Sequence, residues 1–243
     1  MEAYRYLAAV YDRMMDDVDY DAWAAYLHGL LQRHGAKRVF EAACGTGALT
    51  QRLYDLGYDI VASDISEAML RTATENARKS GREIRYIRQD LRHMETARPV
   101  DAIVCACDGL NYVDLSGAKA FARSAYAALK PGGLLLFDIS THYKLKNVMD
   151  GQVYFDDTDD ATCIWQNRFS EPEGTLTMDV TLFIRRGELF ERQSERHVQY
   201  AHDNEILRGV MRDAGFGTVE IYDAFTANAP VKETQRAQFV CTR

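Results

Sequence analysis

The sequence predicts an α/β fold: a doubly wound, mostly parallel sheet with a terminal antiparallel strand and an antiparallel β insertion. Three observations carry this prediction. Helix-like and strand-like patterns alternate as far as about residue 140. From 152 to 200, strand-like segments follow one another with no helical pattern between them. A turn that contains two glycines directly follows the first predicted strand, where a helix must start close to the sheet.

Apolar periodicity places the elements of the first part of the chain. Strands are expected at about 37–42, 58–63, 83–88, 100–106 and 133–139. Helices are expected near 4–15, 20–34, 47–56, 66–79 and 116–129. Ser66 is a good N-cap, and Gly57 is a good stop for the preceding helix. Strands joined by helices in this order form a parallel sheet with helices on both faces.

The second part of the chain begins with the insertion. Its strands are expected at 153–155, 162–169, 175–184 and 189–200, with turn residues such as Glu173-Gly174 between them. A helix then follows Asp203, with Ile206 on its predicted buried face, and it ends at Gly215. Two final strands are expected at 219–222 and 238–242.

Composition indicates a compact enzyme-like chain. It has 243 residues, and 47% of them are hydrophobic, which is enough for one large α/β domain with an insertion. No apolar run approaches the roughly 20 residues of a spanning helix, and the first residues lack a basic segment before an apolar one. We therefore expect a cytoplasmic protein without membrane spans. The five cysteines form no C-x-x-C pair, so neither a disulfide framework nor a metal site is predicted.

The formal net charge of −7 bears on the partner. Proteins that bind RNA or DNA gain affinity by neutralising phosphates, so an acidic chain argues against a nucleic-acid substrate. Arginines do gather near 82–88 and at 185–186. We interpret them as part of a solvated face of mixed charge.

One motif predicts a nucleoside pocket. The run Val39-Phe40-Glu41-Ala42-Ala43-Cys44-Gly45-Thr46-Gly47 ends the first strand, and Asp64 ends the second, about twenty residues later. An acid at that place can accept both ribose hydroxyls. Thr50 stands where a dinucleotide site needs a small residue, and Glu41 can face a cationic group. These features favour a positively charged ligand without a pyrophosphate.

These residues resemble motif I, (D/E)-x-G-x-G-x-G, of the class I S-adenosylmethionine (SAM)-dependent methyltransferases, with Ala43 in place of the first glycine. Five landmarks follow in order over about residues 37–140. The resemblance implies a seven-stranded Rossmann-like sheet and SAM as cofactor. It also implies four parts, which are an N-terminal helical lid (1–36), a SAM-binding core (37–141), an antiparallel cap over the substrate (142–200) and the rest of the core (201–243).

The resemblance also implies which residues contact SAM. Asp64 would bind the ribose, Ile65 and Met69 would flank the adenine, and Asp90 and Leu91 would contact its edge. The remaining implied contacts lie in the glycine turn and after the fourth strand: Glu41, Ala43, Gly45, Gly47, Cys107 and Asp108.

Candidates for catalysis come from the insertion and the N-terminus. Glu195 and His197 share one face of a strand, which could line a substrate cavity, and His197 is the first candidate for a base. An exposed histidine without a role is the alternative. We expect Tyr11 to lie near the methyl group of SAM. The alternative is that its ring only packs in the core.

Further residues are substrate candidates. Trp165 and Asn167 share a face of an inserted strand, although packing is an equal alternative for the tryptophan. Asn111 lies in Gly109-Leu110-Asn111-Tyr112, where adenine- and glutamine-N-methylating enzymes carry N-P-P-Y. The absence of both prolines argues against that subclass.

The main hypothesis is therefore a SAM-dependent methyltransferase that acts on nitrogen or oxygen of a small molecule, as a monomer or homodimer. Methylation of RNA or protein is one alternative. A non-catalytic SAM-binding protein is another.

Overall fold

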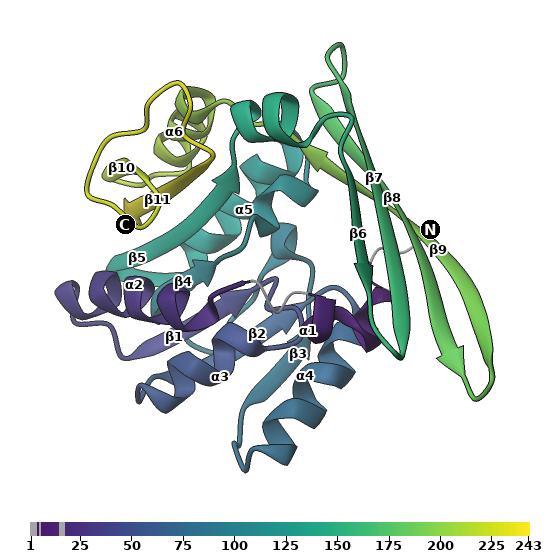
Figure 1. The fold of residues 1–243 in the computed structure, drawn as a ribbon. Helices are drawn as coiled ribbons and strands as arrows, with labels where there is room; N and C mark the ends of the chain where they lie inside the picture. The colour runs from purple at the N-terminus through teal and green to yellow at the C-terminus, as the bar shows by residue number, and fades with distance from the viewer. Residues whose placement is uncertain (1–3, 5, 15–17) are drawn as a thin grey trace.

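The computed structural model describes residues 4, 6–14 and 18–243, and it contains two sheets (Figure 1). The larger sheet has the strand order β10-β11-β5-β4-β1-β2-β3. Its strands are β1 (Arg38–Ala42), β2 (Asp59–Asp64), β3 (Arg85–Arg88), β4 (Val100–Cys105), β5 (Leu129–Ser140), β10 (Thr218–Asp223) and β11 (Arg236–Thr242). Within this sheet β11 alone runs in the opposite direction to the other six strands, which confirms the predicted fold class.

Helices cover both faces of the large sheet. On one face, α2 (Tyr20–Arg33) and α3 (Ala48–Asp55) bury their apolar sides against β1, β2 and β4. On the other, α5 (Leu115–Ala128) and α6 (Asn204–Asp213) pack against β4, β5 and β11. α4 (Glu67–Lys79) follows β2, and Ser66 caps it by accepting a hydrogen bond from the backbone of Met69, as predicted. Alternation of strand and crossover helix thus produces the three-layer core.

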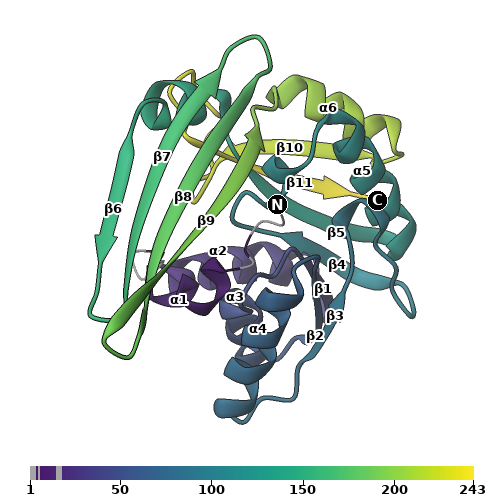
Figure 2. The same cartoon turned by 90° about the vertical axis from the view of Figure 1, so that its right-hand side faces the viewer.

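The second sheet is the predicted insertion. It has the order β6-β7-β8-β9, formed by β6 (Val153–Asp157), β7 (Ala161–Ser170), β8 (Thr175–Arg186) and β9 (Leu189–Tyr200), and all its pairings are antiparallel. Figures 1 and 2 show it standing beside the larger sheet, with the N-terminal segment at its base. Its inner face buries Cys163, Val180 and Leu182 against Leu7 and Val10 of that segment.

Three local predictions were wrong. The expected helix over 4–15 is replaced by a short turn, Leu7–Ala9, and by α1 (Tyr11–Met14), because Tyr4 takes a left-handed backbone with φ of 63°. Residues 5 and 15 of that prediction lie outside the described residues. Ile206 is 53% exposed, so the buried face of α6 is narrower than predicted. β5 begins at Leu129, earlier than the strand expected at 133–139, because Leu129 already pairs with Val100 of β4 before the register shifts.

No helix among the described residues is long and apolar enough to cross a membrane.

Candidate functional site

A cavity of about 490 Å³ lies at the carboxyl ends of β1, β2 and β4. This is the end of a parallel sheet where α/β proteins bind ligands. Its walls come from the loops after these strands, from the N-terminal segment and from the end of β9. The predicted cofactor residues that line it are Glu41, Ala43, Gly45, Asp64, Ile65, Met69, Asp90, Leu91 and Cys107.

The turn after β1 and the acid at the end of β2 meet directly. The backbone N–H of Gly45 donates to Oδ2 of Asp64 over 2.9 Å, and the N–H of Ser66 donates to its Oδ1 over 2.8 Å. Burial raises the pKa of the Asp64 carboxyl group, while these hydrogen bonds oppose the shift. The two halves of the sequence motif therefore form one wall of the cavity.

The glycines of the turn have different uses. Gly45 has φ of 55°, and a Cβ there would meet nothing within 4 Å, so its backbone faces open space. Ala43 takes a left-handed φ of 54° despite its Cβ, at a small cost in strain. Gly47 is not among the described residues that line the cavity. A Cβ on it would lie 2.5 Å from the hydroxyl of Tyr86, so here glycine makes room for a neighbouring side chain.

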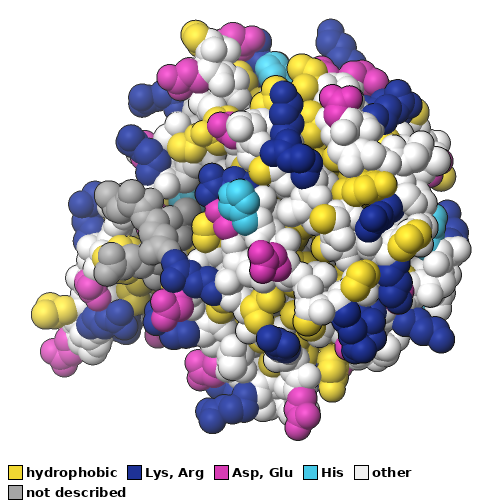
Figure 3. Space-filling model, turned by 180° about the vertical axis from the view of Figure 1, so that it is seen from behind, with side chains coloured by type: hydrophobic (Ala, Val, Ile, Leu, Met, Phe, Trp, Pro, Cys, Tyr) yellow, Lys and Arg dark blue, Asp and Glu magenta, His cyan; other side chains and the backbone are white. Residues whose placement is uncertain are grey.

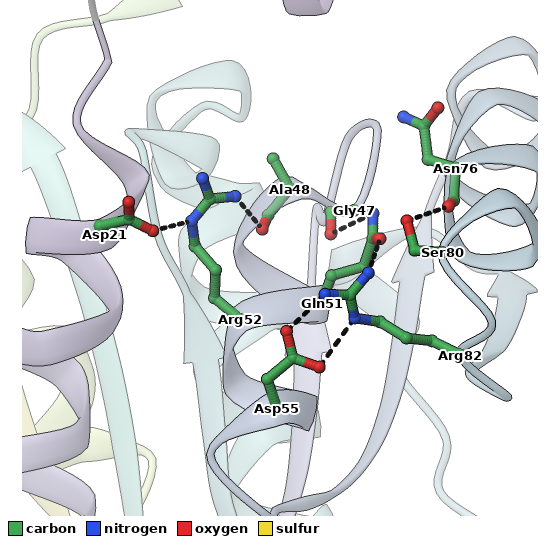
Figure 4. Close-up of polar contacts among 9 residues, drawn as sticks. All are labelled: Asp21, Gly47, Ala48, Gln51, Arg52, Asp55, Asn76, Ser80 and Arg82. Atoms are coloured by element: carbon green, nitrogen blue, oxygen red, sulfur yellow. Dashed lines mark hydrogen bonds and ion pairs between the residues drawn. The ribbon is translucent and has the colours of Figure 1, made fainter.

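The helix that follows the turn is braced from two sides (Figure 4). Arg52 in α3 donates to Asp21 of α2 and to the carbonyl of Ala48. Arg82, which precedes β3, donates twice to Asp55 at the end of α3. These contacts tie the C-terminal half of α3 to α2 on one side and to the segment before β3 on the other.

Glu41 is a buried carboxylate without a full set of partners. Its side chain at the end of β1 is 3% exposed, and its Oε2 has no hydrogen-bond partner among the described residues. Burial raises its pKa to about 8. An orphaned buried acid in a cavity wall fits a ligand that carries a cationic group.

Part of the cavity lining is apolar. Ile65 is 52% exposed beside the buried Met69, and Leu91 lies on the same cavity. A flat apolar ring would cover this surface. Asp90 caps a short turn and is bound by Arg92, which keeps the pKa of Asp90 low. These features fit a nucleoside whose base covers the apolar surface and whose sugar lies at Asp64.

Asp108 does not line the cavity, contrary to the prediction. The backbone of both Cys107 and Asp108 is left-handed, with φ of 57° and 54°, and this turns the two side chains apart. Cys107 remains in the cavity wall. The Asp108 carboxylate instead binds Arg236 at 2.9 Å and accepts a 2.6 Å hydrogen bond from Gln199 of β9.

The sequence reading missed this buried polar cluster. Arg236 also binds Asp138, which is completely buried in β5, and it lies over the ring of Trp23. Asp138 itself was the available signal, since it interrupts an apolar strand and a buried acid needs a partner. The cluster joins β4, β5 and β11 to β9. It therefore connects the larger sheet to the inserted sheet β6–β9, which is called the cap below.

Five tyrosines form the wall nearest the cap. They lie in the N-terminal segment, in α2, after β4 and at the end of β9: Tyr4, Tyr11, Tyr20, Tyr112 and Tyr200. Among these five tyrosines, Tyr11 is the one that was predicted to be catalytic. Burial raises its pKa well above the ordinary value for tyrosine, so its hydroxyl is neutral at physiological pH and can donate a hydrogen bond.

Glu195 and His197 lie behind this wall and do not line the cavity. Both are buried, so the alternative of an exposed histidine is wrong. Nε2 of His197 lies 3.1 Å from Oε2 of Glu195, and the ring packs edge-on against Tyr4 with centroids 4.6 Å apart. This placement separates His197 from any acceptor in the cavity by the tyrosine layer.

The other substrate candidates also lie outside the cavity lining. Trp165 donates to the sulfur of Cys163 and packs against the apolar cluster around Leu7. Asn167 is buried with both amide atoms unpartnered among the described residues. Asn111 is fully buried and does not line the cavity, and its amide group bonds to the backbone of Ser140 and Tyr200.

Comparisons with known proteins agree with this geometry. Residues 39–133 match the model of a methyltransferase domain. The chain is 30% identical to the putative methyltransferase YqeM of Bacillus subtilis, over 97% of this chain and 95% of that protein.

Solved structures extend the likeness. A SAM-dependent methyltransferase from Clostridium acetobutylicum superposes with a TM-score of 0.86 and 27% identity, over 99% of both chains. The sugar N-methyltransferase KedS8 from Streptoalloteichus has the same fold at 18% identity, with a TM-score of 0.81 over 100% of this chain and 95% of that one. The chain belongs to the class I SAM-dependent methyltransferases.

Proposed function

We propose that this SAM-dependent enzyme transfers the methyl group to nitrogen or oxygen of a small molecule. The observation that carries the proposal is the shape of the cavity. It extends without interruption from the wall formed by Gly45 and Asp64 to the tyrosine wall beneath the cap. Its volume of about 490 Å³ is in the range of small-molecule sites, about 300–1,000 Å³.

The cofactor would be held by the wall described above. Asp64 would accept from the ribose hydroxyls, Glu41 would face the cationic methionine end, and Ile65 with Met69 would enclose the adenine. Ala43, Gly45, Asp90, Leu91 and Cys107 complete the wall. When bound, SAM supplies a methyl group that is already activated, so the protein chiefly has to align the acceptor.

The tyrosines would position that acceptor. We assign Tyr11 to contact with it, as a neutral hydroxyl that donates or accepts a hydrogen bond and not as a base. His197 is not assigned as a base, because the ring of Tyr4 lies on its cavity side. The proton of an acceptor amine or alcohol would then pass to solvent water, since no residue is assigned as its base.

A small acceptor also agrees with the surface. On the face drawn in Figure 3, basic and acidic side chains are interspersed and do not form a broad basic stripe. KedS8, which has the same fold, is a sugar N-methyltransferase, and this favours nitrogen as the acceptor atom.

Turnover on a defined panel tests the proposal. Release of S-adenosylhomocysteine would be followed with amines, amino sugars, alcohols and phenols, and in parallel with RNA and with protein extracts. We expect saturable turnover with at least one small molecule and little dependence on salt. Methylation confined to RNA or protein would overturn the proposal, and tight SAM binding without any turnover would favour the non-catalytic alternative.

Replacing Asp64 with alanine tests the cofactor wall. Loss of the charge-assisted hydrogen bonds is expected to weaken SAM binding by about 1–3 kcal/mol, measured by isothermal titration calorimetry. Asp59→Ala is the matched control, because Asp59 lies at the other end of the same strand and pairs with Arg38 on the surface. Equal affinity of the Asp64 variant and the wild type would exclude the assigned role.

A further inference from the structure

Glu195 has a bonding pattern that the proposed reaction does not use. Its carboxylate accepts from three backbone N–H groups of the N-terminal segment. Oε2 accepts from Tyr4 at 2.9 Å, and Oε1 accepts from Leu7 at 3.0 Å and also from Tyr6. His197 occupies Oε2 as well. These four partners occupy the roughly four acceptor positions of a carboxylate, so the protein itself uses the bonding capacity of Glu195.

The charge state of Glu195 supports this anchoring. Burial disfavours ionisation, but the hydrogen bonds from His197, Tyr6 and Leu7 outweigh burial and lower the pKa of the carboxyl group. Glu195 is therefore ionised at neutral pH. An ionised acceptor forms the stronger kind of hydrogen bond to each backbone N–H.

The same segment is also fixed to the core. Asp12 in α1 accepts from the hydroxyl of Thr46, in the glycine turn, over 2.5 Å. Its other oxygen accepts from Asn76 of α4 over 2.8 Å. Between these contacts and Glu195, Leu7 and Val10 are buried on the inner face of the cap. The segment thus spans from the cap sheet to the SAM-binding core.

Two tyrosines of this segment line the cavity. Tyr4 forms a 2.5 Å hydrogen bond with the hydroxyl of Tyr112, and its ring lies 5.7 Å from that of Tyr11. The left-handed φ of 63° at Tyr4 is unfavourable for a tyrosine, so a contact outside the residue must hold it. The bond from its own N–H to Glu195 is such a contact.

We infer that Glu195 is a positioning residue of the methyltransferase: it anchors the backbone of the N-terminal segment to the cap and thereby places Tyr4 and Tyr11 in the cavity wall. His197 completes the anchor through its contact with Oε2 of the carboxylate and by packing its ring against that of Tyr4. This role concerns how the cavity is closed and does not depend on the identity of the acceptor.

The first test compares Glu195→Gln with Glu191→Gln. Glutamine keeps the shape of the side chain but removes the charge and turns an N–H₂ group toward the backbone donors. Glu191→Gln makes the same chemical change on the same strand, and within the described part of the chain the side chain of Glu191 contacts surface groups, those of Arg186 and Gln193. We expect hydrogen exchange at the amides of Tyr6 and Leu7 to accelerate at least tenfold in the Glu195 variant alone. The amides of β1 and β4 should keep their protection in both.

The second test uses the affinity for S-adenosylhomocysteine, which requires no acceptor. We expect its dissociation constant to rise about tenfold in Glu195→Gln and about as much in Tyr4→Ala. If Glu195 acts through the placement of Tyr4, the double variant should lose little more than either single one.

Two results would overturn the inference. One is unchanged exchange at Tyr6 and Leu7 in Glu195→Gln. The other is full additivity of the two substitutions, which would show that Glu195 and Tyr4 act separately. Should Glu195→Gln fail to fold, Glu195→Asp keeps the charge with a shorter reach, and intermediate exchange rates and affinity are expected for it. Failure to find a small-molecule acceptor would leave these results unaffected, so the two proposals can be told apart.

Discussion

Replacing Arg236 with methionine is expected to destabilise the protein by about 3–5 kcal/mol, the cost of leaving a buried charge without its partner. Arg236 is the counter-ion of two carboxylates, Asp138 and Asp108. Asp138 is completely buried, and Asp108 is held beside it by its own backbone N–H, which donates to Asp138. Without the guanidinium group the two acids would face each other in the interior. Urea unfolding at pH 7 measures the loss.

Two further variants show whether charge is the cause. Asp138→Asn in the Arg236→Met background should recover much of the stability, because it removes the more deeply buried of the two charges that were left unpaired. Arg196→Met is the matched control: Arg196 pairs with Asp179 on the exposed face of the cap, where an ion pair contributes about 0–1 kcal/mol. The loss should also shrink as the pH falls and the carboxyl groups become protonated. Equal losses in the Arg236 and Arg196 variants would contradict this account.

The pairing of Arg236 with Asp138 could be predicted only in part from the sequence. The polar residue inside the apolar run Leu134–Ser140 could be recognised, and it required a partner. The partner lies 98 positions later and is brought near only by the antiparallel pairing of β11 with β5. That register is a tertiary property, and no local pattern encodes it.

The glycine turn and Asp64 could be predicted for the opposite reason. Their positions follow from local rules: a parallel strand ends at the ligand-binding edge, and the next strand along the chain lies beside it. Two short apolar strand patterns and one helical pattern between them suffice to bring Gly45 and Asp64 together. The same reasoning correctly predicted the antiparallel insertion, since its four strands are joined by short turns.

For Glu195 and His197, part of the arrangement could be predicted from the sequence and part could not. Alternation along the strand correctly placed both on one face, and the structure shows that this face is buried. Their partners could not be predicted, because the N-terminal segment reaches them from 189 and 191 positions away. The prediction of a helix over 4–15 was wrong for the same reason, because Tyr4 takes a left-handed backbone and its N–H bonds to this distant carboxylate.

Replacing Glu41 with glutamine is expected to act in opposite directions on stability and on cofactor binding. Burial raises the pKa of Glu41 to about 8, and the nearby Asp64 adds to the shift. The unfolded chain releases this proton near the ordinary pKa of glutamate, so between that value and about 8 the free protein loses stability as the pH rises. Glutamine resembles the protonated acid, and the variant should be more stable than the wild type by about 2–3 kcal/mol at pH 7. Near pH 4.5 the difference should vanish.

The pH dependence of SAM binding should reveal the same proton, and its direction should be opposite to that of the stability: affinity rises with pH while stability falls. A cationic ligand group beside Glu41 favours its ionised form, so binding of SAM to the wild type below about pH 8 should release close to one proton and tighten as the pH rises. Titration calorimetry at pH 7 in buffers of different ionisation enthalpy counts that proton. Glu41→Gln should bind more weakly and release none, whereas Glu67→Gln, which loses only an exposed pair with Arg71, should behave as the wild type does. Proton release that persists in the Glu41 variant would place the titrating group elsewhere in the cavity, with Asp64 as the remaining buried acid whose pKa is raised there.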